Sequence, residues 1–194
     1  DKDNGQFKVN GLKLGDYTMT ETIAPAGYVM DTTPRSATLT AAAADVEITT
    51  DFVNTLGSLS WVKQDAKGSL LAGATFRVTG PFGYDVTVLD DSALDADKTS
   101  GEFKLLGLKL GTYTVAETVP PAGYILDPAS QNATLTQATP NATITTAFVN
   151  TLGELLWTKD KGDAAKTPLG GATSASAIQA VTWAGSGALL LAVL

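Results

Sequence analysis

The sequence contains an internal repeat: residues 1–65 align without a gap to residues 97–161 and are identical at 36 of these 65 positions. The offset is 96 residues (97 − 1), which is longer than the unit of a solenoid and matches one small domain. We therefore expect tandem copies of one domain that are cut out of phase. Residues 1–56 would be the C-terminal half of a repeat, 57–152 a complete repeat, and 153–173 the first strand of another.

The complete repeat reads as a series of short strands. Its apolar, Thr-rich and β-branched runs are short and are separated by Gly, Pro and Asp turns, a pattern typical of β-structure. The runs lie at 58–64, 74–79, 85–89, 102–105, 113–119, 133–137 and 142–150. The sequence thus predicts an all-β fold made of antiparallel β-sandwiches, one complete and two partial.

The composition excludes several kinds of chemistry. The chain has no Cys and no His, which rules out disulfides, thiol nucleophiles, Cys/His zinc sites and Ser-His triads. The net charge is −7 and no segment is rich in Lys or Arg, so we do not expect nucleic-acid binding. We expect no metal, no cofactor and no enzyme that turns over a substrate.

Strand periodicity places three polar side chains on core faces. Successive side chains of a strand point to opposite faces, so Lys63 shares a face with Leu59 and Trp61. By the same rule Glu117 lies on an apolar face with Tyr113, Val115 and Val119, and Asn150 on one with Ile144, Thr146 and Phe148. A buried amine and a buried carboxyl each need a partner, so these three groups should compensate one another.

Two interpretations of this trio remain open at this point. In the first, Lys63 and Glu117 form a buried ion pair and Asn150 hydrogen-bonds to it, with no reaction. In the second, burial leaves the lysine amine neutral, and the amine attacks the Asn150 side-chain carbonyl with loss of ammonia while Glu117 moves protons.

The chain also resembles a known family. The segments Gly57-Ser58-Leu59-Ser60-Trp61-Val62-Lys63, Leu71 to Phe76, Gly101-Glu102-Phe103, Tyr113 to Thr118 with Pro121-Ala122-Gly123-Tyr124, and Phe148 to Thr151 together resemble a Cna-B-type domain. This family comprises prealbumin-like β-sandwiches of Gram-positive surface adhesins and pilins. The resemblance implies a spontaneous isopeptide bond between Lys63 and Asn150, with Glu117 as the catalytic residue.

The partial copies carry incomplete sets of the same residues. Glu21 and Asn54 correspond to Glu117 and Asn150, and Lys159 corresponds to Lys63. Asn54 and Lys159 are therefore unpaired counterparts within the chain. One expectation is that Lys159 of one molecule joins Asn54 of another.

The C-terminal tail departs from the repeat. Lys166 is the last charged residue, and residues 174–194 end in an apolar run that is a candidate for the start of a membrane or sorting segment and for membrane contact. Leu169-Gly170-Gly171-Ala172-Thr173 lacks the Pro and the terminal Gly of the LPxTG sortase motif.

Together these features predict a stalk module of an extracellular, cell-wall-associated protein. Its partners would be neighbouring repeats, with host matrix or glycan bound through other domains. The alternative is a ligand-binding adhesive sandwich without a covalent cross-link. The aromatic side chains Trp61, Phe76, Phe103 and Phe148 are expected in the core, and the acidic clusters at Asp90-Asp91 and Asp95 to Asp97 are expected to be solvated turns rather than a calcium site.

Overall fold

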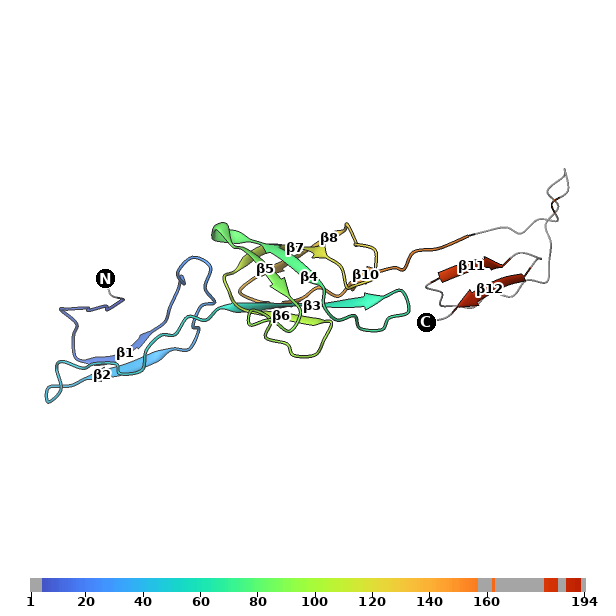
Figure 1. Cartoon of the computed structure of the whole chain (residues 1–194). Coiled ribbons are helices and arrows are strands. Elements are labelled where there is room, and N and C mark those ends of the chain that lie inside the picture. The colour runs from blue at the N-terminus through green and yellow to red at the C-terminus, as the bar shows by residue number, and fades with distance from the viewer. Residues whose placement is uncertain (1–4, 157–161, 163–179, 185–187, 193–194) are drawn as a thin grey trace. The chain divides into compact units, whose positions relative to one another are not determined.

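The computed structural model describes residues 5–156, 162, 180–184 and 188–192. The chain divides into two compact units, Asp1–Gly153 and Glu154–Leu194. In the second unit, β11 (Ala180–Ala184) and β12 (Ala188–Ala192) form an antiparallel pair within the apolar tail (Figure 1). Among the described residues, no helix has the length and apolar character needed to cross a membrane.

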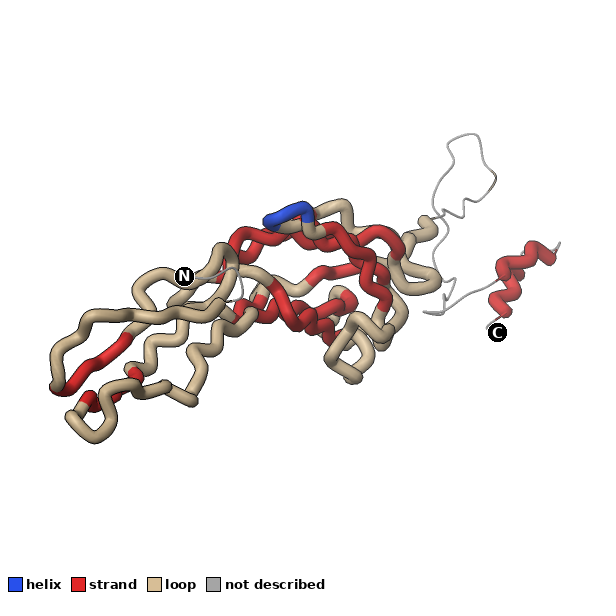
Figure 2. The backbone as a smooth tube through the Cα atoms, turned by 90° about the vertical axis from the view of Figure 1, so that its left-hand side faces the viewer, coloured by secondary structure: helices blue, strands red, loops and turns tan. Residues whose placement is uncertain are grey.

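The complete repeat is built from two four-stranded sheets (Figures 1 and 2). In the first sheet β3 (Gly57–Asp65) is central and pairs with β6 (Glu102–Leu108), β9 (Asn141–Thr143) and β10 (Phe148–Asn150). The second sheet has the order β5 (Asp85–Leu89), β4 (Thr75–Thr79), β7 (Gly111–Val119) and β8 (Ser130–Leu135). The only helical element in the described residues is the single 3-10 turn η1 (Pro81–Gly83).

The core between the sheets is aromatic, as the strand periodicity predicts. Trp61 stacks on Phe103 at a centroid distance of 5.1 Å, and Phe76 meets Phe103 and Phe148 edge to face at 4.9 and 4.8 Å. All four rings are at most 1% exposed. Aromatic pairs in these geometries add about 0.5–1.5 kcal/mol each beyond the burial of their area. These rings are thus core residues and not a surface platform.

The expectation of purely antiparallel sheets is wrong for the first sheet. β3 pairs antiparallel with β6 but parallel with β9 and β10. The expected strand 142–150 is also interrupted. The pairing offset changes from 83 residues (143 − 60) in β9 to 85 (148 − 63) in β10, so two extra residues separate the strands. Thr146 lies in this interruption and is exposed, contrary to the expected core face.

Val119 is also exposed rather than buried, at 52%. The register of β4 against β7 shifts between Thr75 and Phe76, so that Thr75 pairs with Val119 and Phe76 pairs with Glu117. Such a bulge breaks the two-residue alternation beyond it. The inward face of β7 therefore ends at Glu117.

The N-terminal half repeats the β7–β8 hairpin. β1 (Gly15–Met19) and β2 (Arg35–Leu39) pair antiparallel from Gly15↔Leu39 to Met19↔Arg35. The pairs of β7 and β8 at the 96-residue offset, Gly111↔Leu135 to Val115↔Gln131, are in the same register. In this hairpin the repeat is therefore present in the structure as well as in the sequence.

Contacts join the N-terminal half to the complete repeat. The side-chain amide of Gln137 donates to Tyr28 O at 2.8 Å and accepts from Met30 N at 2.9 Å, as a strand edge would. The Leu110 N–H donates to Gly27 O at 2.7 Å. Gly27 has a φ of +86°, and a Cβ there would lie 2.9 Å from the side chains of Lys109 and Phe82, so only glycine fits.

Candidate functional site

Lys63 lies on the core face of β3, next to the aromatic cluster. Its side chain is fully buried, at 0% exposure, as the strand periodicity predicts. The Nζ atom donates to the carbonyl oxygens of Phe148 at 2.9 Å and Gln64 at 3.1 Å. Phe148 is the direct partner of Lys63 across the parallel β3–β10 pair. The amine is therefore held at the seam between the first and last strands of the repeat.

Glu117 and Asn150 reach the same point from β7 and β10. They are 5% and 1% exposed. Glu117 Oε1 lies 3.9 Å from Lys63 Nζ, and Glu117 Oε2 accepts from Asn150 Nδ2 at 2.6 Å. The backbone N–H of Asp127 donates to the same Oε2 at 3.0 Å. The carboxylate thus lies between the amine and the amide, with one oxygen toward each.

Burial shifts the protonation equilibrium of the Lys63 amine toward its neutral form. Burial lowers the pKa of Lys63 below its usual value, while the nearby carboxylates of Glu117 and Asp127 oppose this shift. Glu117 Oε1 and Asn150 Oδ1 are buried and have no hydrogen-bond partner among the described residues. The oxygen that would take up charge if an amine attacked the Asn150 amide is therefore not engaged by another group.

Two buried aspartates near this site were not anticipated, because the acidic clusters were expected to be solvated. Asp90 and Asp95 are 7% and 0% exposed, so that expectation is wrong for both. Asp90 accepts from Gly73 N at 2.7 Å and from Gly101 N at 3.1 Å, and Gly101 O accepts from Lys63 N at 2.8 Å. Asp90 thereby fixes the turn that holds the backbone of Lys63. No spacing rule distinguishes such carboxylates from exposed ones in the sequence.

Asp95 stabilises the same loop through hydrogen bonds from backbone N–H groups. Its carboxylate accepts from the backbone N–H groups of Lys104 at 2.9 Å, Asp97 at 3.1 Å and Asp91 at 3.3 Å. Burial nevertheless raises the pKa of the Asp95 carboxyl. No group of three or more acidic side chains in the described part of the chain is arranged to hold a metal ion.

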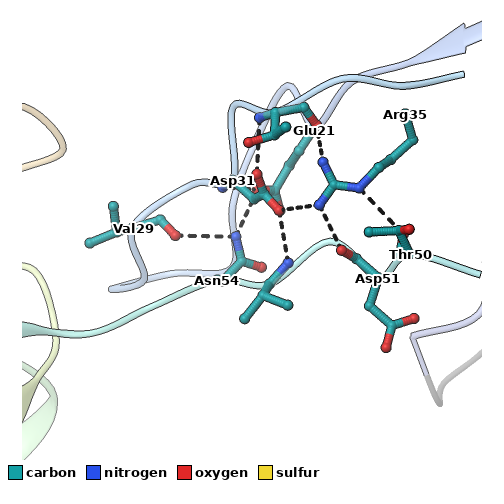
Figure 3. A network of polar contacts seen from close by, with 9 residues as sticks. Glu21, Val29, Asp31, Arg35, Thr50, Asp51 and Asn54 are labelled. Carbon is teal, nitrogen blue, oxygen red and sulfur yellow. Dashed lines mark hydrogen bonds and ion pairs between the residues drawn. The ribbon is translucent and has the colours of Figure 1, made fainter.

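The partial copies differ in what the structure places together. Glu21 and Asn54 lie side by side in the N-terminal half, in a polar network with Asp31 and Arg35 (Figure 3). Lys159 lies outside the described residues, and no described lysine forms an ion pair with Glu21. The structure therefore brings together one complete trio and one Glu–Asn pair.

The complete repeat is thus a β-sandwich of two four-stranded sheets with a buried Lys, Glu and Asn. The family model of the SpaA prealbumin-like fold domain matches residues 1–54 and 57–150. The chain belongs to this family.

Solved structures with a similar fold come from Gram-positive bacteria. The TIE protein of Bacillus anthracis is 23% identical with a TM-score of 0.51, and the match covers 73% of this chain and 26% of that one. A streptococcal ancillary pilin is 25% identical with a TM-score of 0.38, covering 73% and 43% of the two chains. The chain thus spans less than half the length of either. No curated protein matches it.

Proposed function

We propose that this chain is a structural stalk segment of a Gram-positive cell-surface protein and that its complete repeat, residues 57–152, cross-links itself through an isopeptide bond between Lys63 and Asn150. The observation that carries the proposal is the burial of an amine, a carboxylate and an amide in one apolar core, with Glu117 Oε1 3.9 Å from Lys63 Nζ and Glu117 Oε2 2.6 Å from Asn150 Nδ2. Membership of the prealbumin-like fold family supports the setting.

The chemistry follows from the order of the three groups. The neutral Lys63 amine attacks the side-chain carbonyl carbon of Asn150, and a C–N bond forms. The proton that the amine loses passes to Glu117, whose Oε1 is the carboxyl oxygen that lies near Nζ. Glu117 in turn gives a proton to Asn150 Nδ2, which contacts Oε2. The C–Nδ2 bond then breaks and ammonia leaves. One amine and one primary amide become one secondary amide and ammonia, so atoms and charge balance.

The fold supplies what free groups lack in water. β3, β7 and β10 fix the three side chains before reaction, so that the amine and the amide need not find each other by diffusion. The apolar surroundings disfavour the ammonium form and favour the nucleophile. Because the product is a stable amide, the reaction happens once for each molecule and is maturation rather than turnover.

Intact mass spectrometry of the purified chain tests the proposal. The expected mass is about 17 Da below that of the sequence, because one ammonia is lost per bond. Lys63→Arg and Asn150→Ala should each restore the full mass, as should Glu117→Ala in a folded chain. A tryptic peptide joining residue 63 to residue 150 should appear only in the unmodified sequence. A full mass for the unmodified chain would contradict the proposal.

A further inference from the structure

Both copies of the repeat contain the turn sequence Pro-Ala-Gly-Tyr, at residues 25–28 and 121–124. In each copy the N–H of the tyrosine donates to the carbonyl oxygen of the proline, at 3.0 Å in the first and 3.1 Å in the second. Gly27 and Gly123 have φ values of +86° and +87°, as the third position of a type II turn requires. The two turns are therefore alike in sequence and backbone conformation.

The surroundings of the two turns differ. A Cβ at Gly27 would lie 2.9 Å from Lys109 Cβ and 2.9 Å from Phe82 Cε2, both in the complete repeat. At Gly123 a Cβ would have no heavy atom of the described residues within 4 Å apart from its chain neighbours. The N–H of Leu110 also donates to Gly27 O at 2.7 Å. The first turn is thus packed against the complete repeat so closely that a side chain has no room.

Gln137 binds the backbone of the same turn. Its Nε2 donates to Tyr28 O at 2.8 Å, and its Oε1 accepts from Met30 N at 2.9 Å. The local turn of Gln137 does not need a glutamine, because Ala41 holds the equivalent position in the other copy. Both of these turns close with a hydrogen bond from the N–H of the preceding threonine, at 3.1 and 3.0 Å. The contact with residues 28–30 is therefore what the glutamine side chain adds.

Phe82 and Lys109 complete the contact surface. Phe82 has a φ of +57°, which is rare for a residue other than glycine, and its side chain is 62% exposed. Lys109 Nζ lies 4.6 Å from the centroid of the Phe82 ring and 5.7 Å from that of the Tyr28 ring, within the range of cation–π attraction. Backbone strain at a residue outside the core is typical of a functional position. The strained turn thus presents its ring to the lysine and the neighbouring repeat.

We propose that the surface formed by Phe82, Lys109, Leu110 and Gln137 is a recognition site for the Pro-Ala-Gly-Tyr turn of a neighbouring repeat, and that this contact fixes the angle between the two repeats. The surface binds two carbonyl oxygens and one N–H of the turn region, so it recognises backbone conformation and the absence of a Cβ. The tyrosine ring adds the contact with the lysine. This role extends the proposed stalk function and does not depend on the isopeptide bond.

NMR of the isotopically labelled full chain tests the recognition site. In the unmodified chain, one alignment tensor should fit the residual dipolar couplings of both the β1–β2 hairpin and the complete repeat. The N–H groups of Leu110 and Met30 should be protected from hydrogen exchange, because each donates across the contact. In Gly27→Ala the couplings should need two tensors, and both N–H groups should exchange at least about tenfold faster. Gly123→Ala is the matched control and should leave both readouts unchanged.

Two further variants change the complete repeat alone. Phe82→Gly relieves the positive φ while removing the ring, so the unfolding midpoint of the complete repeat should not fall, yet exchange at Leu110 and Met30 should quicken. Gln137→Ala introduces the residue found at position 41 and should quicken exchange at Met30 with no loss of stability. Neither variant alters the β1–β2 hairpin, so neither can act by unfolding it.

Several outcomes would overturn this inference. They are two alignment tensors in the unmodified chain, unchanged exchange in Gly27→Ala, or the same acceleration in Gly123→Ala, which would assign the effect to turn strain instead of docking. The intact mass of the same samples keeps the two proposals apart. A chain with the mass deficit but two tensors contradicts only the recognition site, whereas a chain with one tensor and full mass contradicts only the cross-link.

Discussion

At the scale of single residues, the site depends on a lysine with no access to water. Lys63 Nζ has two backbone carbonyl oxygens as hydrogen-bond partners, and the Glu117 carboxyl group lies 3.9 Å away. Desolvation penalises an ammonium in this position, and the partial compensation by Glu117 does not remove the penalty. The burial that would be costly for a permanent ion pair is therefore useful for a nucleophile.

The free amine of Lys63 should titrate at a lower pH than a solvent-exposed lysine. In Asn150→Ala the amine cannot be consumed, and its pKa should lie below the usual 10.5. NMR titration of the isotopically labelled lysine side chain measures it. A pKa at or above 10.5 would contradict the argument for a neutral nucleophile.

The same shift predicts a pH dependence of stability. The pKa of Lys63 is lower in the folded than in the unfolded variant, so the unfolded state binds more protons between the two values. The unfolding free energy of Asn150→Ala should therefore rise with pH through that interval. Urea titrations of Lys63→Met/Asn150→Ala, which lacks the amine, serve as the control and should show less of this rise.

At the scale of elements, β3 is the strand on which the first sheet depends. It has β6 on one side and both β9 and β10 on the other, and it carries Trp61 and Lys63 on its core face. Its end is held by the Asp90 turn through Gly101, where φ is +86° and a Cβ would lie 2.9 Å from Leu71 N. The backbone position of Lys63 is thus set by the loop between β5 and β6, through the hydrogen bond from Lys63 N to Gly101 O.

Asp90→Ala should destabilise the domain strongly. It leaves the N–H groups of Gly73 and Gly101 without their acceptor, which costs about 1–3 kcal/mol for the Gly101 donor, because Gly101 is buried. Chemical denaturation measures the loss, and mass spectrometry after refolding should show slower bond formation. Asp85→Ala, which breaks the half-exposed pair with Arg77, is the matched control and should change stability far less. Equal losses in both variants would contradict the assigned role of Asp90.

At the scale of the whole repeat, the proposed bond determines the path of a pulling force. The chain enters at Gly57 and leaves after Asn150, and these points lie at opposite ends of the parallel pair β3–β10. Force would run along β3 to Lys63, cross to Asn150 and leave, so that residues 64–149 carry no load. Closing a loop of 87 residues (150 − 63) also stabilises the fold by roughly 4–5 kcal/mol, by analogy with a disulfide.

Single-molecule pulling of the full chain should show this difference directly. The unmodified chain should show no unfolding step from residues 64–149. Lys63→Arg should show an added step of roughly 30 nm, less the folded end-to-end distance, at about 3.4 Å per residue over 87 residues (150 − 63). Identical traces for the two chains would mean that no covalent bridge carries the force.

The repeat and the core faces of the strands can be predicted from the sequence, because the patterns that indicate them are local. The 96-residue offset exposes the repeat, and the two-residue alternation of strands places Leu59, Trp61 and Lys63 on one face whatever their neighbours are. The burial of Lys63, Glu117 and Asn150 confirms the predicted core faces of these three residues. The cross-link itself remains a proposal.

The tertiary structure alone decided the rest, because those features depend on which strands become neighbours. Alternation does not reveal that β9 and β10 run parallel to β3, or that bulges expose Val119 and Thr146. Nor does it reveal that Asp90 is buried, because the donors that compensate its charge, Gly73 and Gly101, are brought to it by the fold. The face to which a side chain points is a property of one strand. The direction of strand pairing and the hydrogen bonds to a buried carboxyl group depend on several segments packed together.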